Sequence, residues 1–261
     1  MVGTLTPCVL LSRRLSGAPT LHRMLAAHLP WRDLDEGPFR ADGPLHAVVE
    51  LAASEPQAAH AALIEALQPG LWFTHLYETE SRDFNRLLLH ALAESGYTVL
   101  HLDRTDEVDR LFALALAQRA QVWRAHEVDT LRERLRAGES PPDLSALALQ
   151  HLVQHELAYR HWMQAELAHY PHRVHTVTHA ELYRSGLQGL VTVDALFGAC
   201  GLGQRQARLD DASLLRLLFH ADDHASGLRQ YAPALQQAYA LIQQEAHATI
   251  DGWAPQACPQ H

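Results

Sequence analysis

The sequence predicts an α/β fold in which a mainly parallel central sheet is flanked by helices, with a helix-rich C-terminal half. Two observations predict it. Short apolar runs that are typical of buried strands alternate with longer segments whose apolar residues recur at helical spacing. The segments between them carry Gly, Pro and Ser residues, which end regular structure.

The first half of the chain begins with a strand, a turn and a helix. The apolar run Cys8 to Leu11 predicts a buried strand, and the small residues up to Thr20 predict the turn. Leu21, Met24 and Leu25 then recur as one face of a helix. Further strands are predicted at Leu45 to Leu51, Leu71 to Leu76 and Tyr97 to Leu102, and helices at Gln57 to Leu67 and Ser81 to Ala93.

The second half is predicted to be mainly helical. One long helical region runs from Asp106 to Arg136 and another from Leu144 to Ala168. Val174 to Thr178 is the last predicted strand, and helical segments and a frayed tail at residues 253–261 follow it. No repeat, linker or charge block divides the chain, so we expect a single domain over residues 1–261.

The charged residues exclude several kinds of chemistry. All 21 cationic side chains are arginine, against 30 carboxylates and a formal net charge of -9. Without lysine there is no Schiff-base chemistry, no lysine general base and no Walker lysine on a phosphate. An anion site must therefore use arginine, backbone N–H groups and helix N-termini. The acidic balance also argues against a nucleic-acid partner.

Cysteine content and hydropathy indicate a cytoplasmic protein without an integral membrane segment. Cys8, Cys200 and Cys258 are few and far apart, which predicts reduced thiols. The N-terminus lacks the basic segment of a signal peptide. The longest apolar stretch, Leu111 to Ala117, is too short to span a bilayer and fits either a buried core or a homodimer interface.

The turn after the first strand is a candidate anion site. In parallel sheets, ligands bind beyond the carboxyl ends of strands, where the next helix presents its N–H groups. Ser16, Gly17 and Ala18 are small enough for the backbone to approach a phosphate closely, and Arg13 or Arg14 would supply positive charge. The alternative is a plain turn that leads into a helix.

Two further strand ends carry candidate residues. Arg104 follows the strand Tyr97 to Leu102, where it would bind an anion or simply pair with a carboxylate such as Asp103. His75 lies near the end of the strand Leu71 to Leu76. It would accept a proton from a substrate hydroxyl or serve as a hydrogen-bonded structural imidazole.

Four stretches, in this order, resemble a known family. They are SRRLSGAPTL, FTHLYE, HLDRTDEVDRLFALALAQRAQVW and HRVHTVTHAEL. Together they resemble the bacterial sulfotransferases that use 3′-phosphoadenosine 5′-phosphosulfate (PAPS), among them the nodulation-factor and trehalose sulfotransferases. The resemblance implies a P-loop-like three-layer fold. It also implies transfer of a sulfuryl group from PAPS to a hydroxyl of a carbohydrate or other small metabolite.

The resemblance implies a role for each candidate residue. It implies that the residues from Ser12 to Thr20 bind the 5′-phosphosulfate and that Arg104 binds the 3′-phosphate. His75 matches the histidine that serves as the base in many members. Some bacterial members use a glutamate shortly after the first helix, and Glu36 lies in about that place. PAPS would be the co-substrate, and no metal is expected.

Departures from the family pattern keep alternatives open. Leu15 stands where the family has a cation, and Ala113 or Phe112 where it has a serine. One alternative is therefore a non-catalytic or repurposed sulfotransferase-fold binding protein with a degenerate donor site. A kinase-like phosphotransferase is a further alternative, although the missing lysine removes the usual clamp on the β- and γ-phosphates.

Histidine pairs four residues apart are possible metal ligands. A chain with 19 histidines is expected to hold about one such pair by chance. His220 and His224 form the strongest candidate, because Asp222 and Asp223 lie between them. The remaining pairs are His151 with His155, and His175 with His179. We nevertheless expect no metal centre.

Overall fold

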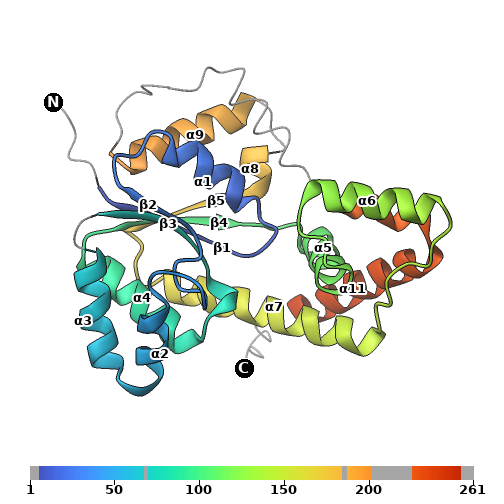
Figure 1. Cartoon of the computed structure of the whole chain (residues 1–261), viewed down its shortest axis with the longest axis horizontal. Helices are drawn as coiled ribbons and strands as arrows, with labels where there is room; N and C mark the ends of the chain where they lie inside the picture. Colours follow the sequence, from blue (N-terminus) through green and yellow to red (C-terminus); the bar gives the residue numbers. More distant parts are fainter. Residues whose placement is uncertain (1–5, 68–69, 184–186, 202–224, 254–261) are drawn as a thin grey trace, which may run out of the picture. The chain divides into compact units, whose positions relative to one another are not determined.

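The protein is an α/β structure with an all-parallel sheet. The computed structural model describes residues 6–67, 70–183, 187–201 and 225–253. The sheet has the strand order β2-β3-β1-β4-β5 (Figure 1). Its strands are β1 (Cys8–Ser12), β2 (Arg32–Glu36), β3 (Leu71–Leu76), β4 (Thr98–Asp103) and β5 (Val174–Thr178).

Helices make up most of the remaining described chain. The helices before β5 are α1 (Ala18–Ala26), α2 (His46–Ser54), α3 (Pro56–Leu67), η1 (Tyr77–Thr79), α4 (Arg82–Glu94), α5 (Glu107–Ala120), α6 (Ala125–Arg136) and α7 (Ala146–Leu167). Those after it are α8 (His179–Tyr183), α9 (Leu187–Ala199), η2 (Ser226–Tyr231) and α11 (Pro233–Asp251). In the described chain after β4, β5 is the one strand and all other regular elements are helices. This confirms the predicted α/β fold class and the helix-rich C-terminal half.

Backbone contacts divide the chain into two compact units. The first unit comprises residues 1–105 and 165–222 and holds the sheet. The second comprises residues 106–164 and 223–261 and is helical in its described part. The single domain expected over residues 1–261 stays a prediction. No helix in the described ranges is long and apolar enough to cross a membrane.

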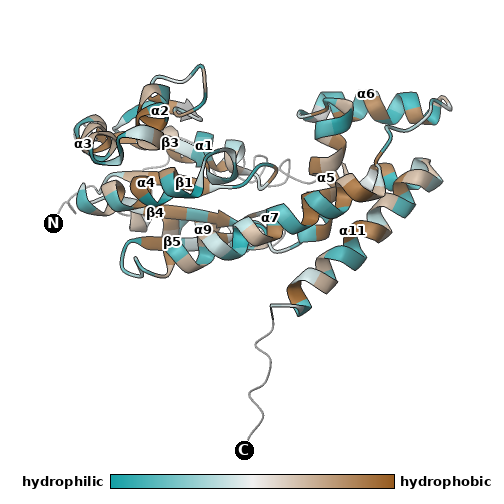
Figure 2. Cartoon of the chain, turned by 90° about the horizontal axis from the view of Figure 1, so that it is seen from below, coloured by the Kyte–Doolittle hydropathy of each residue, from teal (hydrophilic) through white to brown (hydrophobic). Residues whose placement is uncertain are grey.

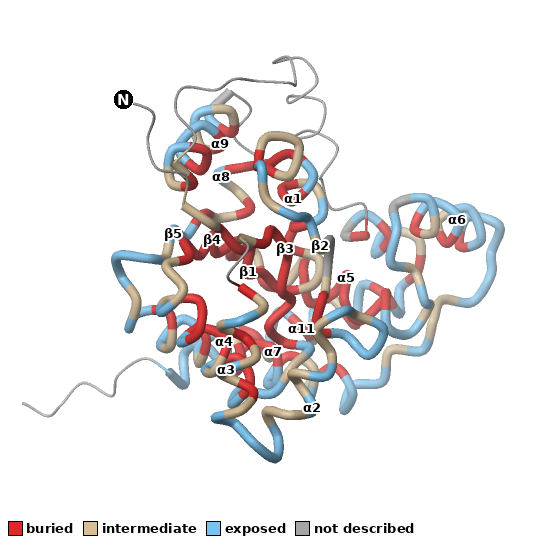
Figure 3. The backbone as a smooth tube through the Cα atoms, turned by 60° about the vertical axis from the view of Figure 1, so that its left-hand side comes forward, coloured by how far each residue is buried: buried red, intermediate tan, exposed pale blue. Residues whose placement is uncertain are grey.

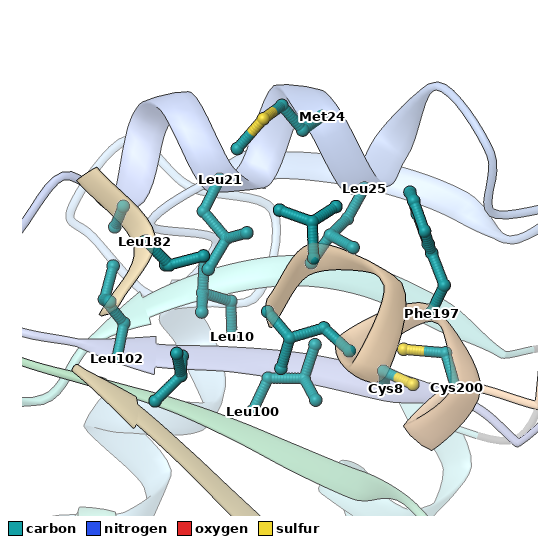
Figure 4. Packing of buried hydrophobic residues seen from close by; sticks show 14 of the residues in the cluster. Cys8, Leu10, Leu21, Met24, Leu25, Leu100, Leu102, Leu182, Phe197 and Cys200 are labelled. Atoms are coloured by element: carbon teal, nitrogen blue, oxygen red, sulfur yellow. The ribbon is translucent and has the colours of Figure 1, made fainter. Parts of the chain in front are cut away.

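The first unit is a three-layer sandwich. Helices α1, α8 and α9 cover one face of the sheet, and α2, α3 and α4 lie on the other (Figure 1). Leu10 and Leu100 on the strands pack with Leu21, Leu25 and Phe197 in one apolar cluster (Figure 4). The inner strands β1, β3 and β4 are buried along their whole length (Figure 3), so removal of apolar surface from water holds the layers together.

Cys8 and Cys200 belong to the same apolar cluster (Figure 4). Both are free and buried, as predicted for reduced thiols. A hydrogen bond with Cys200 and burial raise the pKa of the Cys8 thiol, so it stays protonated and unreactive. Cys258 lies outside the described residues.

The predicted strand at Leu45 to Leu51 is wrong, because this segment forms α2. Its alanines favour a helix, and this helix packs on α3 and α4 instead of joining the sheet. The sheet instead contains β2, a strand that the sequence did not predict, which forms one edge of the sheet next to β3. Its sequence RDLDE has no apolar run, since edge strands are often charged.

The long helix predicted from Asp106 to Arg136 is broken in two. Gln121 takes a left-handed conformation with φ 57°, which ends α5. Glu127 then accepts hydrogen bonds from the N–H groups of Trp123 and Arg124 at 2.6 and 2.8 Å, which starts α6. Both α7 and α11 carry a mixture of hydrophobic and hydrophilic residues along their length (Figure 2).

Candidate active site

The turn between β1 and α1 lies at the centre of the sheet's carboxyl edge. Ser12, the last residue of β1, pairs with Leu76 of β3 and with Leu102 of β4. The residues that follow these two strands therefore flank the turn on either side. Parallel sheets bind ligands at this edge, so the register alone brings three predicted segments to one place.

The backbone of this turn presents several N–H groups. Leu15 and Gly17 have φ values of 61° and 84°, and the Ser16 N–H donates to the Arg13 carbonyl at 3.3 Å. Within the described residues, the N–H groups of Leu15, Gly17 and Ala18 have no hydrogen-bond acceptor. Successive N–H groups in such turns form a concavity for anions, and the N-terminus of α1 adds its dipole.

Ser16 contributes a buried hydroxyl to the turn. The residue is 0% exposed, and its Oγ has no hydrogen-bond partner in the described part of the chain. An unsatisfied buried hydroxyl costs about 1–3 kcal/mol. A ligand oxygen that hydrogen-bonds to Ser16 would recover this cost, so the position fits an anionic ligand.

Tyr183 requires glycine at position 17. Its hydroxyl donates to the Gly17 carbonyl at 2.7 Å, and a Cβ at position 17 would lie 2.5 Å from Tyr183 Cε2. Burial raises the pKa of Tyr183, so its hydroxyl stays a donor. Sequence reasoning missed Tyr183. The available signal was its position directly after HAEL in the last family-like stretch.

Arg14 is held by a buried carboxylate that sequence reasoning also missed. Glu78 Oε1 accepts from the Arg14 backbone N–H at 2.6 Å and from its Nε at 3.2 Å. The Glu78 side chain is 0% exposed, and its Oε2 has no hydrogen-bond partner within the described residues. Glu78 therefore fixes the turn but also places negative charge beside it.

Arg104 reaches the turn from the end of β4. Its Nη1 donates to the Leu15 carbonyl at 2.7 Å, and the residue is buried. Arg13 is also buried. Its Nη2 contacts Asp103 Oδ1 at 3.4 Å and the Arg104 carbonyl at 3.2 Å. Arg13 and Asp103 thus form a buried ion pair next to Arg104.

His75 lies in the interior on β3. It is 2% exposed, its Nε2 is 2.7 Å from Asn85 Oδ1, and its ring meets those of Phe39 and Phe84 edge-on. Burial lowers the pKa of His75 to about 4, so the imidazole is neutral at pH 7. In this position His75 is a buried, hydrogen-bonded imidazole, and its role as a base stays a prediction.

Glu36 is the last residue of β2 and pairs with Thr74 of β3. Its backbone therefore lies at the same carboxyl edge of the sheet as the turn. Its side chain lies outside the described structure. Ala18 and Thr20 form the first turn of α1, where Ala18 is buried and Thr20 is half-buried.

A hydrogen-bond chain absent from the sequence analysis joins α1 to the sheet. His22 Nδ1 lies 2.9 Å from Thr74 Oγ1, and His22 Nε2 lies 3.0 Å from Asp33 Oδ1. The imidazole also stacks on Trp72 at a centroid distance of 5.1 Å. The chain fixes α1, and with it the turn, against β2 and β3. His22 follows Leu21 on the buried side of α1, which was the available signal.

The three-layer fold and the turn after its central strand define a P-loop-like α/β protein. A family model described as Stf0 sulphotransferase matches residues 64–217, more than half of the chain. The chain therefore belongs to the Stf0 sulphotransferase family, which confirms the resemblance to bacterial sulfotransferases and implies sulfuryl transfer. A search of curated proteins found no match.

The matched span covers part of the candidate site. His75, Glu78 and Arg104 lie within it, whereas the β1–α1 turn and Glu36 precede it. The assignment of the turn as a ligand site therefore depends on its geometry and on its place in the fold.

Proposed function

We propose that this protein transfers a sulfuryl group from PAPS to a hydroxyl group of a carbohydrate or other small metabolite. The β1–α1 turn is the observation that carries the proposal. It combines three N–H groups without acceptors in the described residues, the unsatisfied Ser16 hydroxyl and the Arg14 cation. This donor set suits a phosphosulfate, because it recognises an anion without lysine.

The two ends of the donor nucleotide would be held by connected parts of the site. The 5′-phosphosulfate would bind the N–H groups of Leu15, Gly17 and Ala18 together with Ser16. Arg104 would bind the 3′-phosphate, and its hydrogen bond to the Leu15 carbonyl couples it to the turn. Arg13 would act by positioning, because its guanidinium binds Asp103 and the Arg104 carbonyl.

The donor supplies an activated sulfuryl group, and the chain supplies position, charge and a base. The acceptor oxygen bonds to sulfur as the bond between sulfur and the phosphate oxygen breaks, and adenosine 3′,5′-bisphosphate leaves. The turn's N–H groups and Arg14 would stabilise negative charge on the departing phosphate oxygen. The acceptor's proton passes to a protein base.

Glu36 and His75 are the two candidates for that base. Glu36 is favoured, because its backbone lies at the carboxyl edge and carboxylates act well as bases when positioned. His75 is buried and bound to Asn85, and its lowered pKa makes it a weak base. We therefore infer that His75 positions β3 and α4, whereas Glu36 accepts the proton.

Transfer of labelled sulfuryl tests the proposed reaction. The full chain would be incubated with PAPS labelled in its sulfur and with a pool of sugars and hydroxylated metabolites. We expect a labelled product whose mass exceeds that of one pool member by one sulfuryl group. Glu36→Gln would lower kcat strongly and leave nucleotide binding unchanged. Nucleotide binding without transfer to any pool member would contradict the proposed reaction.

One observation favours a second candidate, a sulfotransferase-fold binding protein without catalysis. The buried Glu78 carboxylate neutralises part of the Arg14 charge that the transfer reaction would use. Such a protein would bind the nucleotide weakly, and its labelled donor would stay intact in the same assay.

A further inference from the structure

Three metal-ligating side chains converge away from the β1–α1 turn. His60 comes from α3, whereas His90 and Glu94 come from α4, and the two helices pack against each other (Figure 1). His90 and Glu94 are four residues apart, so they project from the same face of α4. His60 faces them from the neighbouring helix.

The separations of the ligand atoms suit one metal ion. His60 Nε2 lies 3.1 Å from His90 Nδ1 and 3.4 Å from Glu94 Oε2. One ligand atom from each of the three residues lies within 4.8 Å of the other two. Zinc bound to nitrogen and oxygen at about 2.0–2.2 Å in a tetrahedron separates its ligands by about 3.3–3.5 Å. These two separations, 3.1 and 3.4 Å, are near that range without any movement of the helices.

The site is open to solvent, so an ion can enter and leave. The side chains of His60 and Glu94 are 23% and 58% exposed. Two imidazoles and one carboxylate leave a fourth position for water, and this ligand set suits zinc and neighbouring divalent metals.

We propose that His60, His90 and Glu94 bind a divalent zinc ion, or a metal of similar preference, and thereby link α3 to α4. The proposal departs from the sequence expectation of no metal centre. That expectation considered pairs within one helix, whereas this site needs ligands 30 residues apart. Across the described ranges, no other group of three such side chains converges in this way. The pair His220 and His224 lies outside those ranges.

The competing explanation uses the same atoms without a metal. A protonated His60 would form an ion pair with Glu94, and one imidazole would donate a hydrogen bond to the other. A metal ion would replace the shared proton, since both nitrogens must be deprotonated to coordinate it. The two explanations therefore differ in how the protein responds to added zinc and not in its resting geometry.

Titration of the metal-free full chain with Zn²⁺ tests the proposal. We expect one equivalent to bind more tightly than any further zinc and to raise the melting temperature, because the ion binds the folded state. We expect Co²⁺ to occupy the same site, with the strong visible absorption of a site that has four or five ligands. If the wild-type protein does not bind one equivalent of zinc tightly, the proposal is overturned.

Variants separate this site from the other histidines. His90→Ala and Glu94→Gln should each weaken the tight equivalent at least about tenfold, since losing even an outer-shell partner costs that much. His60→Arg places a cation beside Glu94 but cannot coordinate a metal, so it should preserve the fold and lose the cobalt absorption. His151→Ala is the matched control, because His151 is an exposed helical histidine that also has a second histidine one turn away.

Comparison with the His151→Ala control shows which results would overturn the zinc proposal. Equal zinc affinity in the wild type and in His90→Ala would overturn the proposal, as would loss of the tight equivalent in His151→Ala. Unfolding is not expected to obscure the outcome, because His90 is exposed and alanine is a better helix former than histidine.

Discussion

At the residue scale, substitution of Gly17 tests the close packing of the β1–α1 turn against Tyr183. Gly17→Ala meets two penalties: a left-handed conformation, which costs about 1–2 kcal/mol, and a contact of the new Cβ with Tyr183 at 2.5 Å. We expect a clear fall in the free energy of unfolding and a loss of nucleotide binding, measured by denaturant titration and calorimetry.

Gly138→Ala is the matched control for Gly17→Ala. Gly138 has φ 86°, yet nothing lies within 4 Å of a Cβ built there. It should show the conformational cost alone and leave nucleotide binding intact. Equal destabilisation by the two substitutions would contradict the close packing of Tyr183 on the turn.

Glu78 sets the charge beside the proposed phosphosulfate. Glu78→Gln keeps an oxygen that accepts from the Arg14 N–H but removes the buried negative charge. We expect the protein to bind adenosine 3′,5′-bisphosphate several-fold more tightly and to lose some stability. Calorimetry would compare it with Glu65→Gln on the exposed surface of α3. Weaker nucleotide binding would show instead that the Glu78 charge is needed to hold Arg14.

His75 makes stability depend on pH. Its pKa is about 4 in the folded protein and about 6.5 when unfolded, so the unfolded chain binds more protons between these values. Its stabilising effect is therefore complete above pH 6.5 and is lost as the pH falls toward 4. Between pH 7 and pH 5 this residue alone should remove about 2 kcal/mol from the free energy of unfolding.

Denaturant titrations at pH 7 and pH 5 would measure this loss. His75→Gln should reduce the difference between the two pH values by about that amount, whereas His126→Gln, at an exposed position, should not. An unchanged difference in His75→Gln would contradict a buried, neutral imidazole.

At the scale of elements, α5 depends on a buried ionic network within the second unit. Arg110 is 0% exposed and lies 3.2 Å from Glu107 Oε2 and 3.0 Å from Glu156 Oε2. Arg110→Met leaves two buried carboxylates without this cation and should cost about 3–5 kcal/mol in the free energy of unfolding.

Further variants isolate the charge effect in α5. Adding Glu107→Gln and Glu156→Gln to Arg110→Met should restore much of the lost stability, because the carboxylate charges are then gone. Arg132→Met breaks an exposed pair with Asp129 and should cost no more than about 1 kcal/mol. Thermal or denaturant unfolding measures all of these variants. A small loss in Arg110→Met would show that the network contributes little.

Elements with local signals were predicted well from the sequence, and those defined by distant contacts were not. β1 and α1 follow from an apolar run and helical spacing, and so does the turn between them. β2 was missed because a charged edge strand has no apolar run. α2 was mistaken for a strand because Val48 and Val49 have high β-propensity and only packing decides between the two.

The same distinction applies to the site. Ser16, Gly17 and Arg104 stay predictions as ligand-binding residues, and their places at strand ends could be predicted because small residues and cations there are visible locally. Glu78 and Tyr183 were not predicted, because each acts on the turn across a long sequence separation of 64 and 166 residues. The burial of Arg13 also depends on a residue 90 positions away.

At the scale of the whole molecule, anion recognition without lysine is the defining constraint. The chain has a net charge of -9, so binding of a multiply charged nucleotide must come from local groups and not from the overall field. In the proposed site, the turn binds the 5′-phosphosulfate and Arg104 binds the 3′-phosphate. Each assignment predicts how a particular phosphate affects binding.

Calorimetric binding of adenosine 3′,5′-bisphosphate and of adenosine 5′-monophosphate is the most direct test. The wild-type protein should bind the bisphosphate more tightly, and Arg104→Gln should bind the two nucleotides alike while it keeps an N–H donor for the Leu15 carbonyl. If Arg104→Gln still prefers the bisphosphate as strongly as the wild type, or if the wild type binds neither nucleotide, the proposed donor site is contradicted.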